Sequence, residues 1–246
     1  KDQGYTWDLG PSLVTMPWCF DELFALLDRD FRQEVELIGL DPFYRIDWPH
    51  DGTRIDFKGD VAEMQEELAK LSPVDAANYP AFLEASGKIH RQAVLAAGRR
   101  AFENPLPFAK LLPTMLKLDA ARNLSSFCAK YFSEEHIFQA MSFHSLYIGG
   151  DPYRVPAVYA ALAYLQVADG VWYTKGGMYS IVQAMVRAIE GAGGRVRCNA
   201  DVDEIIVRGG RAIGDRRRWQ RRRRRRAVAA AGRQVGGRRA HQILQA

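Results

Sequence analysis

Cysteine is scarce in this 246-residue sequence, and the three that occur, Cys19, Cys128 and Cys198, are far apart. They form no CxxC pair, and no histidine stands at the spacing that zinc sites require. The sequence therefore predicts neither a disulfide framework nor a metal site. We expect three reduced thiols in the core of a cytoplasmic protein.

Long hydrophobic runs are also missing. The nearest approach to a membrane span, residues 155–168, is shorter than the roughly 18 apolar residues that a span needs, and it contains Gln166. We therefore do not expect an integral membrane protein. The sequence shows no charged segment followed by an apolar stretch, so it gives no sign of a secretory leader. Because Lys1 stands where a Met would open a gene product, we expect the chain to begin inside a longer one.

The usual nucleotide-binding motifs are absent too. A dinucleotide fingerprint places G-x-G-x-x-G directly after a strand, so that the N–H groups of a helix N-terminus hold a pyrophosphate. The segment GAGGRV (191–196) has Val196 at the third glycine position and follows a helical pattern, so we interpret it as the end of a helix. No Walker lysine motif is present.

The excess of positive charge comes from one end of the chain. Residues 214–246 contain twelve arginines and one acid, Asp215, which gives this segment a charge of +11. Since the whole chain has a formal charge of +5, residues 1–213 are left with −6. The basic pI therefore says nothing about the partners of the main body.

Apolar residues make up 48% of the sequence, which is ample for a hydrophobic core. The pattern predicts an extended segment at 4–17 that leads into a helix at 19–31. Residues 35–60 predict a small antiparallel sheet with a turn at His50-Asp51-Gly52. From 61 to 148 the pattern is helical.

Residues 104–118, NPLPFAKLLPTMLKL, are apolar, interrupted by proline and lightly basic, which is unusual for a core helix. Three interpretations are open. The stretch could cap a hydrophobic cavity, lie on a membrane surface, or form half-buried turns that connect helices.

The C-terminal part of the body shows a second helical pattern that follows two glycines. Gly176-Gly177 form a turn from strand to helix, which either lets the backbone approach a cofactor or simply turns the chain. The helix after them has one apolar face, which we expect to be buried: Met178, Ile181, Val182, Met185, Val186 and Ile189. Residues 195–214 predict two strands around a tight turn at Gly209-Gly210.

Several long motifs occur in the order found in one enzyme family. They are GYTWDLGPSLVTMP (4–17), DPFYRI (41–46), FSEEHIFQAMSFHSLYIGGDPYRVPAVYAALAYL (132–165), GVWYTKGGM (170–178) and CNADVDEIIV (198–207). Over about residues 3–213 the chain resembles the bacterial phytoene desaturases of carotenoid biosynthesis, which are FAD-dependent and similar to the amine oxidase superfamily. The resemblance implies a mixed α/β fold, with part of a Rossmann-like FAD/NAD(P)-binding domain and a substrate domain of helices and antiparallel sheet.

The resemblance also implies a division of the chain. Residues 1–34 would enter the flavin domain, 35–165 would form a mainly helical substrate domain, and 166–213 would return to the flavin domain. The arginine-rich tail, 214–246, departs from the family pattern. We interpret the tail as a shifted reading frame; the alternative is an arm that binds nucleic acid or an anionic membrane, which we favour less.

The cofactor implied by the resemblance is FAD. The Gly176-Gly177 turn would pack by the flavin, and the loop of Asp8, Leu9, Gly10 and Pro11 would lie near the isoalloxazine ring. The backbone of Val202 would contact the adenine, with an ordinary inward-facing strand residue as the alternative. Because the N-terminal G-x-G-x-x-G unit of the family is missing, we expect this chain to be an incomplete piece that binds FAD poorly.

The activity implied by the resemblance is desaturation of a polyene such as phytoene, by hydride transfer to the flavin. A hydrocarbon offers no polar handle, so we expect an apolar tunnel and a peripheral contact with the membrane that stores the substrate. A later desaturase, ketolase or isomerase, or an inactive remnant, is the alternative. The resemblance fixes no catalytic residue; His144, Asp151 and Arg154 are titratable candidates for steadying charge, with capping or surface roles as the alternative.

Overall fold

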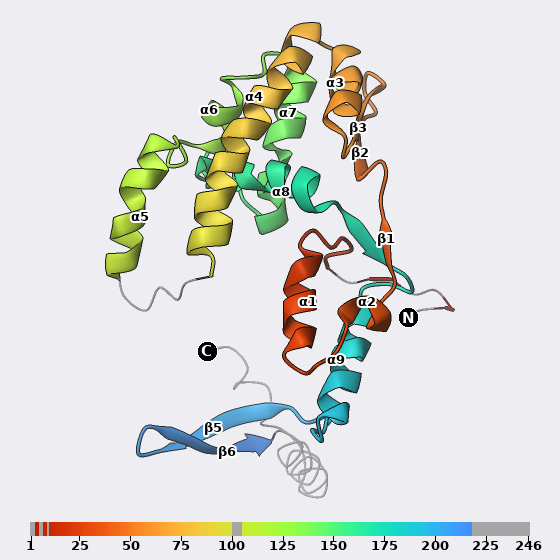
Figure 1. Ribbon diagram of the computed structural model, residues 1–246, viewed down its shortest axis with the longest axis vertical. Coiled ribbons are helices and arrows are strands. Elements are labelled where there is room, and N and C mark those ends of the chain that lie inside the picture. Colours follow the sequence, from red (N-terminus) through yellow and green to blue (C-terminus); the bar gives the residue numbers. More distant parts are fainter. Residues whose placement is uncertain (1–2, 5–6, 9, 100–104, 218–246) are drawn as a thin grey trace, which may run out of the picture. The chain divides into compact units, whose positions relative to one another are not determined.

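The computed structural model describes residues 3–4, 7–8, 10–99 and 105–217 (Figure 1). The chain divides into two compact units, Lys1–Ala188 and Ile189–Ala246. Within the described residues no helix is both long enough and apolar enough to span a membrane.

Most of the first unit is a helical layer built around one hydrophobic core. The helix α4 (Pro73–His90) lies beside α8 (Ala161–Asp169), and a Cβ at Gly87 would stand only 2.8 Å from the ring of Tyr164. A glycine is therefore needed where these two helices approach. The other helical elements of this layer are α3 (Val61–Ala69), η1 (Arg91–Ala97), α5 (Pro105–Lys117), α6 (Leu124–Cys128), α7 (Glu135–Ser142), η2 (Phe143–Ile148) and η3 (Ala157–Ala160).

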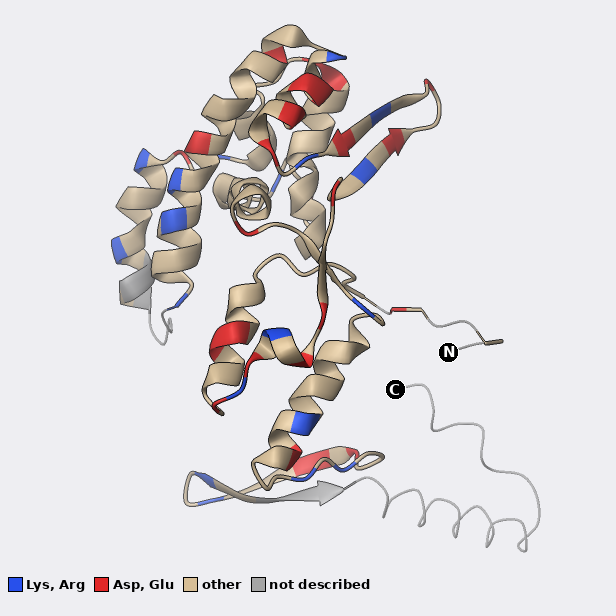
Figure 2. Ribbon diagram, turned by 45° about the vertical axis from the view of Figure 1, so that its right-hand side comes forward, with Lys and Arg blue, Asp and Glu red and all other residues tan. Residues whose placement is uncertain are grey.

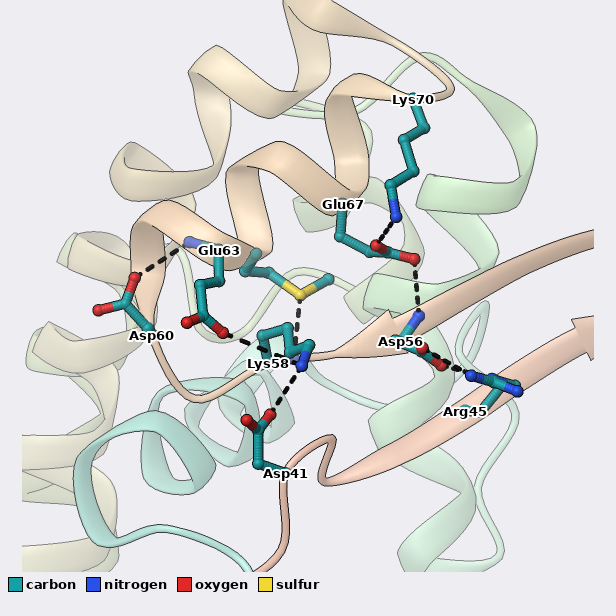
Figure 3. A network of polar contacts seen from close by, with 9 residues as sticks. Asp41, Arg45, Asp56, Lys58, Asp60, Glu63, Glu67 and Lys70 are labelled. Carbon is teal, nitrogen blue, oxygen red and sulfur yellow. Dashed lines mark hydrogen bonds and ion pairs between the residues drawn. The ribbon is translucent and has the colours of Figure 1, made fainter.

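The predicted hairpin is confirmed. Strand β2 (Tyr44–Trp48) pairs antiparallel with β3 (Thr53–Phe57), and Ile55 and Phe57 turn their side chains into the core. A network of charged side chains joins this hairpin to α3 (Figure 3).

In that network Arg45 and Asp56 face each other across the two strands, with Nε 2.5 Å from Oδ1. The backbone N–H of Asp56 donates to Glu67 of α3, which also pairs with Lys70. Lys58, just after β3, reaches Asp41 at 2.9 Å. The network therefore fixes the hairpin against the helix from the outside, while the apolar side chains do so from the inside.

A second sheet brings distant parts of the chain together. Strand β1 (Leu37–Gly39) pairs antiparallel with β4 (Trp172–Thr174), and Val14 exchanges two backbone hydrogen bonds of 2.8 Å with Trp172. Around this sheet α1 (Pro17–Ala25), α2 (Phe31–Glu34) and α9 (Tyr179–Gly191) form a smaller apolar cluster. The N-terminal segment is thus held against residues far along the sequence.

The extended segment expected before α1 includes the bridge at Val14. Two other expectations are wrong. Cys19 and Cys198 are exposed, so of the three thiols only that of Cys128 lies in the core. The helix predicted over 19–31 is broken, because Asp28 takes the left-handed backbone conformation (φ 54°) and the carboxylate of Asp30 caps the separate helix α2.

The buried face expected for the helix after Gly177 is only partly correct. Ile181 is buried, but Val182 and Ile189 are 45% and 44% exposed. Their place is taken by Ala184 and Ala188, which are both buried. The helix packs along a narrow strip of small residues, so its larger apolar side chains stay partly accessible.

The second unit contains a β-hairpin. Strand β5 (Val202–Arg208) pairs antiparallel with β6 (Arg211–Arg217) through a turn at Gly209-Gly210, as predicted. Residues 195–201, expected to be part of the first strand, lie outside it. Residues 214–217 belong to β6, and the rest of the arginine-rich segment, 218–246, lies outside the described residues.

The stability of the helical layer should depend on the buried carboxylate of Asp75. It is 1% exposed and accepts hydrogen bonds from the backbone N–H groups of Ser133 and Glu134 and from the Ser133 hydroxyl. We expect Asp75→Ala to lower the free energy of unfolding by about 3 kcal/mol, because it removes a buried carboxylate that accepts three hydrogen bonds and leaves their part-buried donors without a partner. Asp60→Ala removes an exposed helix cap and should cost about 1 kcal/mol. Urea denaturation that gives equal costs for the two variants would contradict this prediction.

Candidate functional site

The first unit contains a groove and a neighbouring cavity that share one loop. The groove, of about 870 Å³, is lined by Trp7, Asp8, Pro11, Phe20, Gly176, Met178, Tyr179, Ser180, Ile181, Val182, Gln183 and Met185. The cavity, of about 400 Å³, is lined by Gly10, Pro11, Ser12, Leu13, Thr15, Tyr147, Leu162, Leu165 and Gln166. Pro11 belongs to both linings, so the two hollows meet at the loop that precedes α1.

The structure brings five of the residues assigned to the cofactor to this place: Asp8, Gly10, Pro11, Gly176 and Gly177. The carboxylate of Asp8 accepts a hydrogen bond from the backbone N–H of Met178, which lies 3.1 and 3.2 Å from its two oxygens. A Cβ at Gly177 would stand 2.9 Å from an Asp8 oxygen. Gly177 therefore leaves room for Asp8, and Asp8 binds the start of the helical region that becomes α9.

Gly10 and Gly176 have a different surrounding. Both have a positive φ, 106° and 85°, and nothing in the structure lies within 4 Å of a Cβ built on either. Each therefore presents bare backbone to open space at the rim of the groove and the cavity. A flat ring system such as the isoalloxazine of a flavin fits this kind of surface, because it can approach the backbone closely.

Val202, the sixth residue assigned to the cofactor, belongs to the second unit. It begins β5 and is 54% exposed. Its contact with an adenine stays a prediction.

Two of the three titratable candidates lie at the surface. The carboxylate of Asp151 accepts the backbone N–H of Tyr153 at 2.9 Å, and its carbonyl oxygen accepts that of Arg154. Asp151 and Arg154 are both exposed, and neither lines the groove or the cavity. Their geometry is that of a closed turn.

His144, the third candidate, is buried in a cluster of polar side chains. Its Nδ1 lies 3.2 Å from the carbonyl oxygen of Met141, and its Nε2 lies 3.2 Å from Oε1 of Gln166 and 3.3 Å from the hydroxyl of Tyr44. Tyr44 also donates to Gln166 at 3.0 Å. The carbonyl of Met141 and Oε1 of Gln166 can both only accept, so a neutral His144 donates to one of them, from Nδ1 or from Nε2, and the other ring nitrogen is the one that titrates.

Burial sets the charge state of this cluster. Desolvation lowers the pKa of His144, and it raises that of Tyr44 well above its ordinary value. Both are therefore neutral at pH 7. His144 itself does not line the cavity, but Gln166 does, and the Gln166 amide donates to the hydroxyl of Tyr147 at 3.2 Å. A chain of hydrogen-bonding groups thus leads from the cavity wall to the buried imidazole.

The sequence did not reveal Tyr44, Tyr147 or Gln166 as parts of a site. Tyr44 and His144 are 100 residues apart in the sequence, so no local pattern joins them. One signal was available: Gln166 interrupts an otherwise apolar stretch, and such a residue is hydrogen-bonded when it is buried.

We expect this buried histidine to make the protein less stable in mild acid. In the unfolded chain this histidine has an ordinary pKa of about 6.5 and binds a proton below that pH, whereas native His144 does not. The stability that neutral His144 contributes is therefore present above pH 6.5 and is lost as the pH falls below it. In His144→Gln the decline in unfolding free energy between pH 6.5 and 5 should be flatter by up to about 1.4 kcal/mol per pH unit. Urea denaturation at several pH values measures this, and an unchanged decline would contradict it.

Comparisons with known proteins agree with the resemblance seen in the sequence. Residues 1–223 match the family described as flavin containing amine oxidoreductase. The chain is 39% identical over 214 residues to a neurosporene-forming phytoene desaturase of Cereibacter sphaeroides, and 33% identical over 211 residues to a lycopene-forming phytoene desaturase of Pantoea ananas. These alignments cover 87% and 86% of this chain, and 41% and 43% of the relatives.

A relative whose name gives a different activity is also similar. It is a 4,4'-diapolycopene oxygenase of Methylomonas sp., 32% identical over 212 residues, which cover 85% of this chain and 42% of the relative. The chain thus spans about two fifths of the length of these relatives. Since the family match extends over most of the sequence, the chain belongs to the flavin-containing amine oxidoreductases.

Proposed function

We propose that the chain is part of an FAD-dependent enzyme that desaturates a carotenoid precursor such as phytoene. The observation that carries this proposal is the meeting of Asp8, Gly10, Pro11, Gly176 and Gly177 along one groove that adjoins an apolar cavity. The relatives named as phytoene desaturases support the same substrate class.

The groove is the proposed place of the flavin ring. Bound FAD would supply the hydride acceptor for oxidation of an allylic carbon. The bare backbone at Gly10 and Gly176 would face the ring, and Asp8 would hold the start of α9 in position. The contact of Val202 with the adenine, the partial Rossmann-like domain, and the assignment of residues 1–34 and 166–213 to it belong to the same proposal.

The cavity is the proposed place of the polyene. Leu13, Leu162 and Leu165 offer it an apolar wall. Because a hydrocarbon cannot be held by hydrogen bonds, its position depends on the shape of such a wall. Tyr147 and Gln166 add the polar edge described above.

Desaturation removes a proton as well as a hydride, and the polar group at the cavity wall is the hydroxyl of Tyr147. The Gln166 amide donates to this hydroxyl, so Gln166 orients Tyr147 and passes no proton inward. His144 acts here by holding Gln166 from behind and does not touch the substrate.

A related activity on another carotenoid is the second candidate. The observation in its favour is the similarity to the 4,4'-diapolycopene oxygenase of Methylomonas sp.. A later desaturase, a ketolase or an isomerase would use the same groove and cavity, so the carotenoid products distinguish these activities.

The helix α5 is the proposed contact with a membrane surface. The structure shows a helix here, where half-buried turns were one of the three interpretations of the sequence. Leu106, Leu112 and Leu116 of this helix are 61%, 45% and 61% exposed. Its charged residues are Lys110 and Lys117, with no acidic residue (Figure 2). An apolar helix with basic side chains suits the interface of a lipid bilayer, and this contact would make the enzyme peripheral to the cytoplasmic membrane.

We expect the groove to lose flavin binding when a side chain covers the backbone at Gly176. The test is a chimera in which residues 3–213 replace the matching segment of the Cereibacter sphaeroides relative, expressed in phytoene-accumulating bacteria. Gly176→Leu should lower the coloured carotenoid at least tenfold and lower the flavin content of the purified chimera. Gly52→Leu is the matched control, since Gly52 also has a positive φ (77°) and open space around it but lies in the β2–β3 turn.

Four results of the chimera experiment would decide between the two candidate functions and test the groove. Conversion of phytoene by the unsubstituted chimera supports the proposed activity, and an oxygenated or isomerised product supports the second candidate. A chimera that folds, binds flavin and leaves both phytoene and later carotenes unchanged overturns both. Equal losses in Gly176→Leu and Gly52→Leu would place the effect in the fold and not in the groove.

We expect α5 to carry vesicle binding. In neutral phosphatidylcholine vesicles at high salt, where charge is screened, Leu106→Ser with Leu116→Ser should lower the vesicle-bound fraction of the chain at least tenfold. The control pair Leu26→Ser and Val74→Ser removes side chains that are 79% and 69% exposed elsewhere. If flotation recovers equal vesicle-bound fractions of the two variant pairs, α5 is not the membrane contact.

A further inference from the structure

Three metal-ligating side chains meet at the tip of the β2–β3 hairpin. His50 and Asp51 stand in the turn, and His136 stands in the first turn of α7. Oδ2 of Asp51 lies 2.9 Å from Nε2 of His136 and 3.3 Å from Nε2 of His50. All three ligand atoms lie within 4.8 Å of one another.

These separations suit a small divalent cation. In a tetrahedral site with metal–ligand bonds of about 2.0–2.1 Å, neighbouring ligand atoms are about 3.3 Å apart. The two distances to Asp51 are already close to this value, so only the imidazole of His50 has to turn. Its side chain is 71% exposed and is free to do so.

The surrounding groups hold two of the ligands in the orientation that a metal needs. Nδ1 of His136 lies 2.8 Å from Oε1 of Glu134, which leaves Nε2 for the metal. Glu134 is itself fixed, because its other oxygen accepts the backbone N–H of Ile137 at 2.8 Å. One oxygen of Asp51 accepts the backbone N–H of Thr53 at 2.9 Å, which leaves Oδ2 for the metal. A carboxylate behind a ligating histidine is a common feature of zinc sites.

We propose that His50, Asp51 and His136 bind a divalent transition metal of the zinc class, with water in the remaining position. Two imidazoles and one carboxylate suit zinc, cobalt or nickel, whereas magnesium and calcium prefer oxygen ligands alone. None of the three residues lines the groove or the cavity. The metal therefore joins the hairpin turn to α7 and takes no part in the proposed reaction.

The test is a titration of the full chain, with no histidine tag, after removal of metal by a chelator. The thiols are alkylated first, so that the exposed Cys19 and Cys198 do not compete for the metal. Isothermal titration with ZnCl₂ at pH 7.5 should give one ion per chain. His50→Gln and His136→Gln should each raise the dissociation constant at least tenfold, and Glu134→Gln should raise it by about 10–100-fold. His90→Gln, outside the cluster, should leave it unchanged.

His50→Gln is the decisive variant, because an exposed turn residue can be replaced without unfolding the chain. In thermal denaturation ZnCl₂ should raise the Tm of the wild type and not that of His50→Gln. The proposal is overturned if the wild type binds no zinc at 0.1 mM. It is also overturned if His136→Gln weakens binding and His50→Gln does not, since the cluster is then an ion-paired histidine between two carboxylates and nothing more.

Discussion

The contact between Asp8 and the backbone N–H of Met178 is the one on which the candidate site depends. It fastens a loop near the N-terminus to the start of α9, which lies 170 residues further along the sequence. The carboxylate stands where the helix dipole favours negative charge, and Gly177 gives it room. The same loop carries Pro11, which lines both the groove and the cavity. The pairing of Val14 with Trp172 supports it from the other side.

The helix α9 explains why the groove has an apolar wall. It packs on its neighbours through Ala184 and Ala188, and these small side chains let it approach closely. The larger Met178, Val182 and Met185 are then left along the groove. Met178 and Met185 are partly buried and Val182 is 45% exposed, so their remaining apolar surface is costly in water by about 25 cal/mol for each Å². A bound ring system would recover part of that free energy.

The sequence predicted what local residues determine. The hairpin follows from its turn residues and alternating pattern, and the start of α9 follows from the paired glycines. The break between α1 and α2 was missed because it depends on the left-handed backbone of Asp28, which the apolar spacing does not reveal. The buried face of α9 was partly wrong because burial depends on the partner and not on the helix alone. The cluster around His144 could not be predicted, since its members come from β2, η2 and α8.

The polar cluster and the apolar cavity belong to the same physical problem. A buried imidazole is tolerated in the helical layer because it can donate to the carbonyl of Met141 or to Oε1 of Gln166, and Gln166 offers this oxygen from the wall of the cavity. An amide at this wall would be unfavourable against a hydrocarbon unless both of its ends were paired inside the protein. Tyr44 and Tyr147 provide those pairings. The wall can therefore face an apolar ligand while a titratable nitrogen stands directly behind it.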